Sequence, residues 1–169
     1  MPNHGDSRKL TVFDIDGVLA DVGHRLHHLE GPTKDWDGFF EAAAADRVLV
    51  DGLAAVQRVQ DLGRPFAYLS GRPERTRDLT IRWFAVHGFP TADLYLRADA
   101  DRRPARLFKP TVLAGLGGVD AIELVYDDDD AVVAQLRLLG YPVEHVLWGK
   151  SPSEQQELLD SAQERLGRT

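Results

Sequence analysis

The chain of 169 residues has the length of a single domain, which can bury about two thirds of its unfolded surface around one core. Its formal net charge of −7 disfavours nucleic-acid binding by the surface as a whole, so a ligand that carries phosphate would need a local basic patch. The sequence has no cysteine, which excludes disulfides, thiolate zinc sites and a cysteine nucleophile, and no apolar stretch approaches the ~20 residues that cross a bilayer. We therefore expect a cytoplasmic protein without a membrane partner.

Short apolar strand patterns alternate with stretches of helical period, and Gly or Pro marks nearly every junction. This alternation is typical of βαβ units, and strands that are apolar throughout are typical of a parallel sheet with helices on both faces. We expect a flexible tail over residues 1–9 and one doubly wound, Rossmann-like α/β domain over residues 10–169. In chain order, the expected strands are residues 10–13, 66–69, 94–96, 122–126 and 143–147.

Helices are indicated between and after these strands. In residues 73–87, three apolar side chains recur at i, i+4 and i+7, with a proline in the first turn and Gly88 as the stop. Residues 132–139 repeat the spacing before Gly140, and the polar residues 152–166 predict a terminal helix.

Residues 22–50 do not follow the alternation, and we expect them to form a small helical lid. An aromatic stripe at i, i+3 and i+4 predicts packing of this lid on the core, with stacking on a base as the alternative. The stripe consists of Trp36, Phe39 and Phe40.

Three histidines in the same segment, His24, His27 and His28, raise the question of a zinc site. Their spacing lacks both a cysteine partner and the H-E-x-x-H pattern, so we expect polar lid residues instead.

Acidic residues directly follow two of the expected strands. In "TVFDIDGVLAD", Asp14 and Asp16 come after residues 10–13, and the fourth strand runs into Asp127, Asp128 and two further aspartates. The carboxyl ends of parallel strands share one edge of a sheet, where ligands bind, although a solvated or capped turn would also explain each acidic run. Carboxylates from two strands suit Mg²⁺, which prefers hard oxygen ligands.

Two further segments are expected to place polar side chains at the same edge of the sheet. The second strand ends in "SGRP", which places Ser70 there, and a later element offers Lys109. In this order the residues resemble the four motifs of the haloacid dehalogenase (HAD) superfamily of phosphotransferases, which here are Asp14-x-Asp16, Ser70, Lys109 and Asp127-Asp128.

Within that superfamily the chain resembles the 3′-phosphatase domain of polynucleotide kinase/phosphatase. The similarity rests on "FDIDGVLAD" followed by Arg25, on "SGRPERTR", on "YLR" with a later "DxR", and on "VYDDD". The chain departs from that subgroup at Ala105, where an acid usually stands four residues before the lysine, and at Val18, where threonine is usual.

The resemblance implies roles for these residues. Asp14 would be the nucleophile that forms an aspartyl phosphate, and Asp16 the general acid and base, with a pKa that we expect crowded carboxylates to raise. Ser70 and Lys109 would hold the non-bridging phosphate oxygens. The cofactor would be Mg²⁺, bound by Asp14, Asp127, Asp128 and the main-chain carbonyl of Asp16.

A local basic patch is expected from arginines near this edge. Arg25 and Arg72 are the first candidates, because guanidinium groups bind phosphate through two hydrogen bonds. Gly71 and Arg103 complete the expected substrate-binding set, and Arg97 and Arg102 extend it.

Three functions remain open. The first is a phosphatase that acts on a DNA or RNA 3′-end, the second a phosphatase of the same mechanism on free nucleotides or small metabolites. The third is a phospho-acceptor receiver module, which the Asp-x-Asp spacing and the acids after the lysine disfavour. "WGKSP" at residues 148–152 resembles the end of a P-loop, but Glu144 stands where its first glycine is required, so we expect no 5′-kinase domain in this chain.

Overall fold

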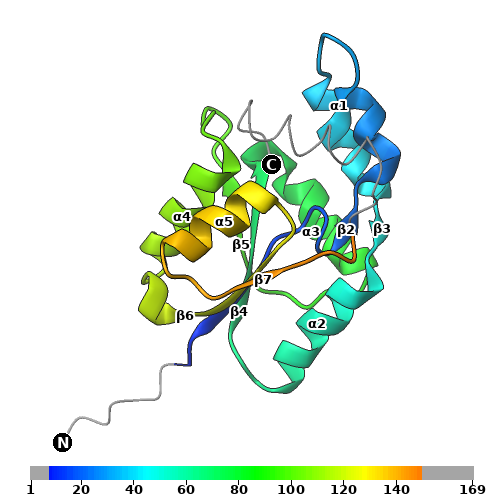
Figure 1. Ribbon diagram of the computed structural model, residues 1–169. Helices are drawn as coiled ribbons and strands as arrows, with labels where there is room; N and C mark the ends of the chain where they lie inside the picture. The colour runs from blue at the N-terminus through cyan, green and yellow to red at the C-terminus, as the bar shows by residue number, and fades with distance from the viewer. Residues whose placement is uncertain (1–7, 150–169) are drawn as a thin grey trace, which may run out of the picture.

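The computed structural model describes residues 8–149, whose centre is a parallel five-stranded sheet in the order β5-β4-β1-β6-β7 (Figure 1). The middle strand β1 (Leu10–Phe13) lies between β4 (Phe66–Pro73) and β6 (Ile122–Asp127). The edge strands are β5 (Asp93–Arg97) and β7 (Val143–His145). All five predicted strands are therefore present, although β7 ends two residues before the predicted end at residue 147.

Helices cover both faces of the sheet. On one face, α2 (Val50–Asp61) and α3 (Arg77–Val86) bury one core cluster against the strands. On the other, α4 (Ala105–Gly115) and α5 (Asp130–Leu138) bury a second cluster. Neighbouring side chains of β1 point to opposite faces and contribute to different clusters, as expected for a strand buried on both sides. The predicted doubly wound α/β fold is confirmed.

The helix predicted from residue 73 begins later. Pro73 is extended, with φ −69° and ψ 150°, and is the last residue of β4. A 3-10 turn, η3 (Glu74–Thr76), follows and leads into α3. The fixed φ of proline suits a strand end as well as a first helical turn, so the residue type alone does not separate the two.

Two helices were not predicted from the sequence, because each has a residue in its interior that is unfavourable in helices. In α2, Gly52 interrupts the apolar spacing, but a Cβ there would lie 2.1 Å from the carbonyl oxygen of Val18, so glycine lets the helix approach that loop. In α4, Pro110 stands inside the helix, where proline is unfavourable. A further 3-10 turn, η4 (Val119–Ala121), precedes β6. The predicted terminal helix over residues 152–166 lies outside the described residues.

The predicted lid corresponds to residues 22–46, which we call the cap segment. It is enclosed by two short antiparallel strands, β2 (Ala20–Asp21) and β3 (Arg47–Val48). Between them lie η1 (Gly23–Leu29), α1 (Trp36–Glu41) and η2 (Ala42–Ala45). None of the helices within residues 8–149 is long and apolar enough to cross a membrane.

The aromatic stripe forms the core of the cap segment itself. Trp36, Phe39 and Phe40 are all buried, and their ring centroids lie 5.3–5.9 Å apart. With Val22, Leu26 and Leu29 they make a third cluster, separate from the two clusters on the sheet. We expected these rings to pack the lid on the main core. In the structure they pack chiefly against one another, and Phe40 also borders Pro73 of β4 and Leu79 of α3.

Candidate active site

Four segments deliver polar side chains to the carboxyl edge of the sheet. Asp14 follows β1, and its N–H donates to the carbonyl of Tyr126 at 2.9 Å, which continues the ladder beyond the strand. Ser70 lies near the end of β4, and Asp127 is the last residue of β6. Lys109 reaches the same place from α4 and is only 2% exposed.

Three carboxylates and one ammonium form a buried cluster here. One oxygen from each of Asp14, Asp127 and Asp128 lies within 4.8 Å of the others. Lys109 Nζ lies 3.0 Å from Asp14 Oδ2 and 2.7 Å from Asp127 Oδ2. The lysine is therefore held by two carboxylates, although the residue four positions before it is Ala105.

The cluster carries more negative charge than Lys109 compensates. Burial and the charges of Asp127 and Asp16 raise the pKa of Asp14 to about 8, although the charge of Lys109 opposes them. Burial, together with Asp14 and Asp127, also raises the pKa of Asp128 well above its usual value. The site thus favours a compensating cation or bound protons.

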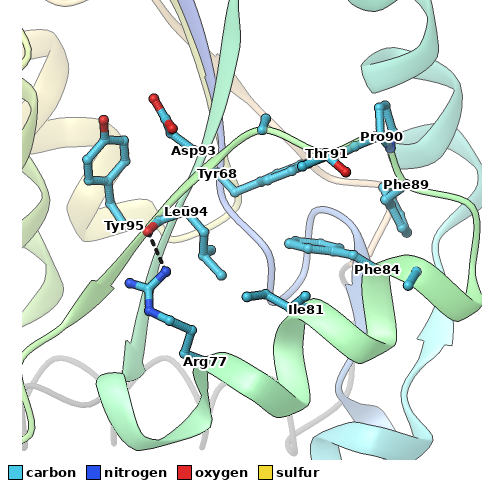
Figure 2. Close-up of a pocket in the computed structure, with 12 residues that line it drawn as sticks. Tyr68, Arg77, Ile81, Phe84, Phe89, Pro90, Thr91, Asp93, Leu94 and Tyr95 are labelled. Atoms are coloured by element: carbon cyan, nitrogen blue, oxygen red, sulfur yellow. Dashed lines mark hydrogen bonds between the residues drawn. The ribbon is translucent and has the colours of Figure 1, made fainter.

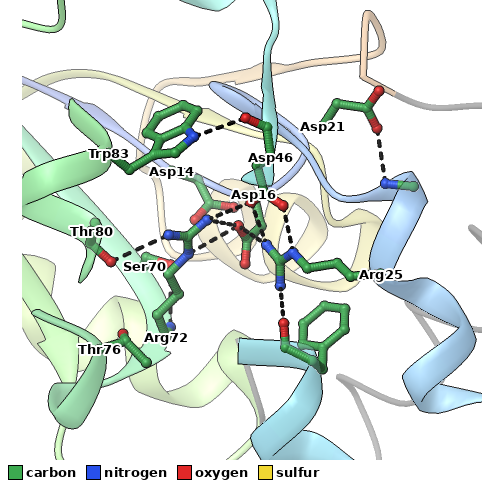
Figure 3. Close-up of polar contacts among 12 residues, drawn as sticks. Asp14, Asp16, Asp21, Arg25, Asp46, Ser70, Arg72, Thr76, Thr80 and Trp83 are labelled. Carbon is green, nitrogen blue, oxygen red and sulfur yellow. Dashed lines mark hydrogen bonds and ion pairs between the residues drawn. The ribbon is translucent and has the colours of Figure 1, made fainter. Parts of the chain in front are cut away.

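Asp16 belongs to a second cluster, which contains the two predicted arginines (Figure 3). Arg25 Nη2 donates to Asp16 Oδ1 at 2.8 Å, and Arg72 donates to the same oxygen through Nη2 at 2.6 Å and Nε at 3.1 Å. Both arginine side chains are fully buried. They lie beside the acids as predicted, but in this structure their donors are engaged with carboxylates.

The expected direction of the Asp16 pKa was wrong. Burial by itself raises this pKa, but the charges and hydrogen bonds of Arg25 and Arg72 outweigh it and lower the pKa to about 2. Proximity to other carboxylates is thus a smaller effect than two guanidiniums in direct contact. The Asp16 side chain faces these arginines, so a metal ligand from this residue remains the predicted main-chain carbonyl.

Asp46 is a member of this cluster that sequence analysis missed. It ends η2 in the cap segment, its side chain is fully buried, and its carboxylate binds both Arg25 and Arg72. An aspartate after four alanines matches no motif. The only available signal was charge: two arginines at the predicted edge carry one positive charge more than Asp16 neutralises.

The remaining predicted residues divide between the site and its surroundings. Ser70 is fully buried, and its Oγ accepts the N–H of Arg72 at 3.2 Å. The carbonyl of Gly71 accepts a hydrogen bond from Arg97 Nε at 3.1 Å. Arg103 has a side chain 48% exposed and binds Asp101 at 2.7 Å, so it is not part of the buried clusters.

The histidines of the cap segment contact acids and backbone. His24 Nε2 lies 2.9 Å from Asp46 Oδ1, and His28 Nδ1 lies 3.0 Å from Asp35 Oδ2. His27 Nδ1 lies 3.0 Å from the carbonyl oxygen of His24. His24 thereby reaches the second cluster from its solvent side.

Comparison with known proteins fits this geometry. Residues 8–150 match the family model described as the polynucleotide kinase PNKP phosphatase domain. The chain belongs to the PNKP phosphatase family. This confirms the resemblance to HAD phosphatases and to the polynucleotide kinase/phosphatase subgroup. No curated protein is significantly similar to the chain.

Solved structures support the same fold. A chain in the structure of the Pnkp1/Rnl/Hen1 RNA repair complex aligns with a TM-score of 0.69 and 23% identity, over 82% of this chain and 42% of that one. A haloacid dehalogenase-like hydrolase from Streptococcus pneumoniae aligns with a TM-score of 0.60 and 13% identity, over 89% and 90% of the two chains. A hydrolase from Pseudomonas syringae aligns with a TM-score of 0.60 and 13% identity, over 89% of this chain and 89% of that one. This PNKP-family chain spans less than half the length of the Pnkp1-complex chain.

The carboxylate cluster of the PNKP-family chain fits a divalent cation. HAD phosphatases generally use Mg²⁺, and Asp14, Asp127 and Asp128 offer the hard oxygen atoms that this ion prefers. Burial and the neighbouring acids raise the pKa of both Asp14 and Asp128, so a bound cation would favour their ionised forms. Within residues 8–149 no other group of three such ligands comes together.

A pocket of about 460 Å³ lies elsewhere in the fold, between α3 and β5 (Figure 2). Its walls include Tyr68, Ile81 and Phe84, and Asp93 at the start of β5 borders it. The acids of the PNKP-family site follow the carboxyl ends of the strands, so this pocket is not part of the site.

We predict that Gly17→Ala disrupts the cluster through Asp128. Gly17 has φ +77°, and a Cβ there would lie 2.0 Å from Asp128 Oδ2, so this buried carboxylate would have to move. We expect a stability loss of about 1–3 kcal/mol and a loss of activity of roughly tenfold or more. Thermal unfolding and phosphate release measure the two effects.

Gly31→Ala is the matched control for this substitution. Gly31 has a similar φ of +78°, but within residues 8–149 no atom beyond its chain neighbours lies within 4 Å of its added Cβ. Both variants carry the backbone strain, and only Gly17→Ala displaces the carboxylate. Equal activity loss in the two variants would contradict the role of Asp128.

Proposed function

We propose that the chain is a Mg²⁺-dependent phosphomonoesterase that removes a 3′-phosphate from a DNA or RNA end. One observation carries this proposal: the Asp14 carboxylate, beyond the central strand, lies against Lys109 and beside Asp127 and Asp128 in a chain of the PNKP phosphatase family. The cluster supports metal-dependent phosphoryl chemistry, and the family supports a nucleic-acid substrate.

Asp14 acts as the nucleophile in this proposal. One of its carboxylate oxygens forms a bond to phosphorus while the bond between phosphorus and the sugar 3′-oxygen breaks, which leaves an aspartyl phosphate. Lys109 and Ser70 hold the non-bridging oxygens and neutralise their charge. Mg²⁺ held by Asp14, Asp127 and Asp128 would supply further positive charge to stabilise the phosphate oxygens.

Asp16 moves the proton. It donates a proton to the departing 3′-oxygen in the first step and accepts one from the attacking water in the second, which releases inorganic phosphate and restores Asp14. The arginines keep Asp16 ionised in the free protein. A phosphate dianion beside it raises its pKa, so substrate binding favours the protonated form that the first step needs.

A compact substrate is the second candidate, favoured by the charges around the site. Arg75 Nη2 lies 2.6 Å from Asp37 Oδ1, and Arg103 Nη2 lies 2.7 Å from Asp101 Oδ2. Each of these exposed arginines is thus matched by an acid, which weakens the attraction for the backbone phosphates of a polymer. A free nucleotide or another small phosphorylated metabolite would undergo the same chemistry.

Phosphate release from three substrates tests the proposal. These are a 3′-phosphorylated oligonucleotide, its 5′-phosphorylated twin and a 3′-mononucleotide, each with Mg²⁺. We expect kcat/KM for the 3′-phosphorylated oligonucleotide to exceed that of the other two by about 100-fold or more, as hydrogen-bonded recognition of the end would allow. Equal or better release from the mononucleotide would favour the second candidate, and no release from any of the three would contradict action on polynucleotide ends and on nucleotides.

A further inference from the structure

We propose that Asp46 is a positioning residue of this site. It holds the guanidiniums of Arg25 and Arg72 in place, and these in turn fix the Asp16 carboxylate with Oδ2 turned toward the substrate oxygen. This inference rests on the proposed function and adds to it a residue of the cap segment that acts through the two arginines.

The Asp46 carboxylate joins the two arginines directly. Its Oδ1 accepts a hydrogen bond from Arg25 Nε at 2.8 Å. Its Oδ2 accepts one from Arg25 Nη2 at 2.8 Å and one from Arg72 Nη2 at 3.0 Å. Two-pronged contacts of this kind fix the orientation of a guanidinium as well as its position.

The same guanidiniums decide which oxygen of Asp16 is available. All three of their hydrogen bonds to Asp16 end on Oδ1. Within residues 8–149 nothing donates a hydrogen bond to Asp16 Oδ2, although this atom is buried. A buried carboxylate oxygen without a donor is costly, so the arrangement reserves Oδ2 for proton exchange with a bound substrate.

The backbone of Asp46 is anchored independently of its carboxylate. Its carbonyl accepts a hydrogen bond from Trp83 Nε1 of α3 at 2.9 Å, and its N–H donates to the carbonyl of Ala43 at 3.2 Å. A change confined to the side chain therefore leaves these anchors in place. Asp46 connects the cap segment with the sheet, where Arg72 lies on β4.

The balance of charges in this cluster is a second argument for the positioning role of Asp46. Asp16 and Asp46 together match the charges of Arg25 and Arg72, and all four side chains are buried. Without the Asp46 charge, two guanidiniums share one carboxylate and gain freedom to turn toward other acceptors. The orientation of Asp16 is then lost while positive charge for phosphate binding remains.

Asp46→Asn tests this with two leaving groups. For a 3′-phosphorylated oligonucleotide, whose sugar oxygen needs a proton on departure, we expect kcat/KM, which reports formation of the aspartyl phosphate, to fall about 10- to 100-fold. For p-nitrophenyl phosphate, whose leaving group departs without a proton, we expect kcat/KM to fall by less than about threefold. KM should not rise for either substrate, because the arginines keep their charge.

Two further variants separate positioning from folding. Asp46→Glu keeps the charge but displaces the carboxylate, and it should show the same leaving-group dependence if Asp46→Asn fails to fold. Asp35→Ala loosens the cap segment elsewhere, because Asp35 caps α1 by accepting the N–H of Gly38. It should lower the melting temperature by about 2–4 °C and leave the kinetics unchanged.

The outcomes distinguish this inference from the proposed function. Equal losses of kcat/KM for both leaving groups, an unchanged kcat/KM in Asp46→Asn, or a loss matched by Asp35→Ala would each overturn the positioning role while the phosphatase function stands. A wild-type chain that releases phosphate from neither substrate would contradict the proposed function, and this inference with it.

Discussion

Asp14→Asn should remove measurable phosphate release and yet leave the metal-free chain at least as stable as the wild type. The loss of activity follows from the nucleophile, since a neutral amide does not form the aspartyl phosphate. We expect phosphate release to fall by more than about 10³-fold, as it does when a covalent nucleophile is removed.

The stability of this variant follows from the electrostatics of the cluster. Burial raises the pKa of Asp14 to about 8, so its ionised form is unfavourable in the folded chain without a cation. Asparagine has nearly the same shape and carries no charge. Lys109 keeps its contact of 2.7 Å with Asp127, so it is not left unpaired. We expect a melting temperature in EDTA that is unchanged or higher by up to about 5 °C.

Asp130→Asn provides the matched control from the same acidic run. Its side chain is 72% exposed, and it contacts His145 rather than the cluster. This variant should keep the wild-type rate. Release by Asp14→Asn within tenfold of the wild type would show that Asp14 is not the nucleophile. A large drop in its melting temperature in EDTA would show that the ionised Asp14 is not unfavourable in the metal-free fold.

The acid cluster illustrates what sequence position alone predicts. Asp14 and Asp127 follow apolar strands, and parallel strands end at a common edge, so their meeting follows from topology before any side chain is placed. Lys109 was harder to place, because Pro110 obscured the helix that carries it. Its family motif, and not its local pattern, indicated the site.

The arginine cluster shows where such reasoning stops. Arg25 and Arg72 were predicted to lie at this edge, but not to be buried against carboxylates. The burial of these arginines depends on Asp46 of the cap segment. No periodicity in that segment predicts where one of its side chains lies relative to the sheet. The pKa of Asp16 depends in turn on these contacts, so its direction could not be derived from the spacing of acids along the chain.

Removal of the metal should abolish phosphate release, and it should destabilise the chain more as the pH rises. Asp14 and Asp128 have pKa values above their usual value of 3.8 in the metal-free fold. Between pH 3.8 and about 8 the folded chain therefore binds more protons than the unfolded chain, so stability falls as the pH rises through the folded pKa of Asp14, about 8. Asp16 has a pKa lowered to about 2, so its stabilising effect is complete above pH 3.8 and adds no slope near neutral pH.

Mg²⁺ reverses this trend because it binds the deprotonated carboxylates. The difference in melting temperature between Mg²⁺ and EDTA should widen from pH 6 to pH 8.5, by roughly 3–8 °C, if the linkage amounts to about 1–2 kcal/mol. Phosphate release in EDTA should fall by more than about 10³-fold.

Asp14→Asn, measured in the same way, separates the cluster from the rest of the protein. Without the Asp14 carboxylate, the metal-free chain loses one of its two strongest proton-linked groups, so its melting temperature in EDTA should fall less between pH 6 and pH 8.5. If the difference in melting temperature between Mg²⁺ and EDTA were independent of pH in the wild type, this would contradict cation binding by these carboxylates. If this difference widened equally with pH in Asp14→Asn, the proton binding linked to stability would belong to other residues.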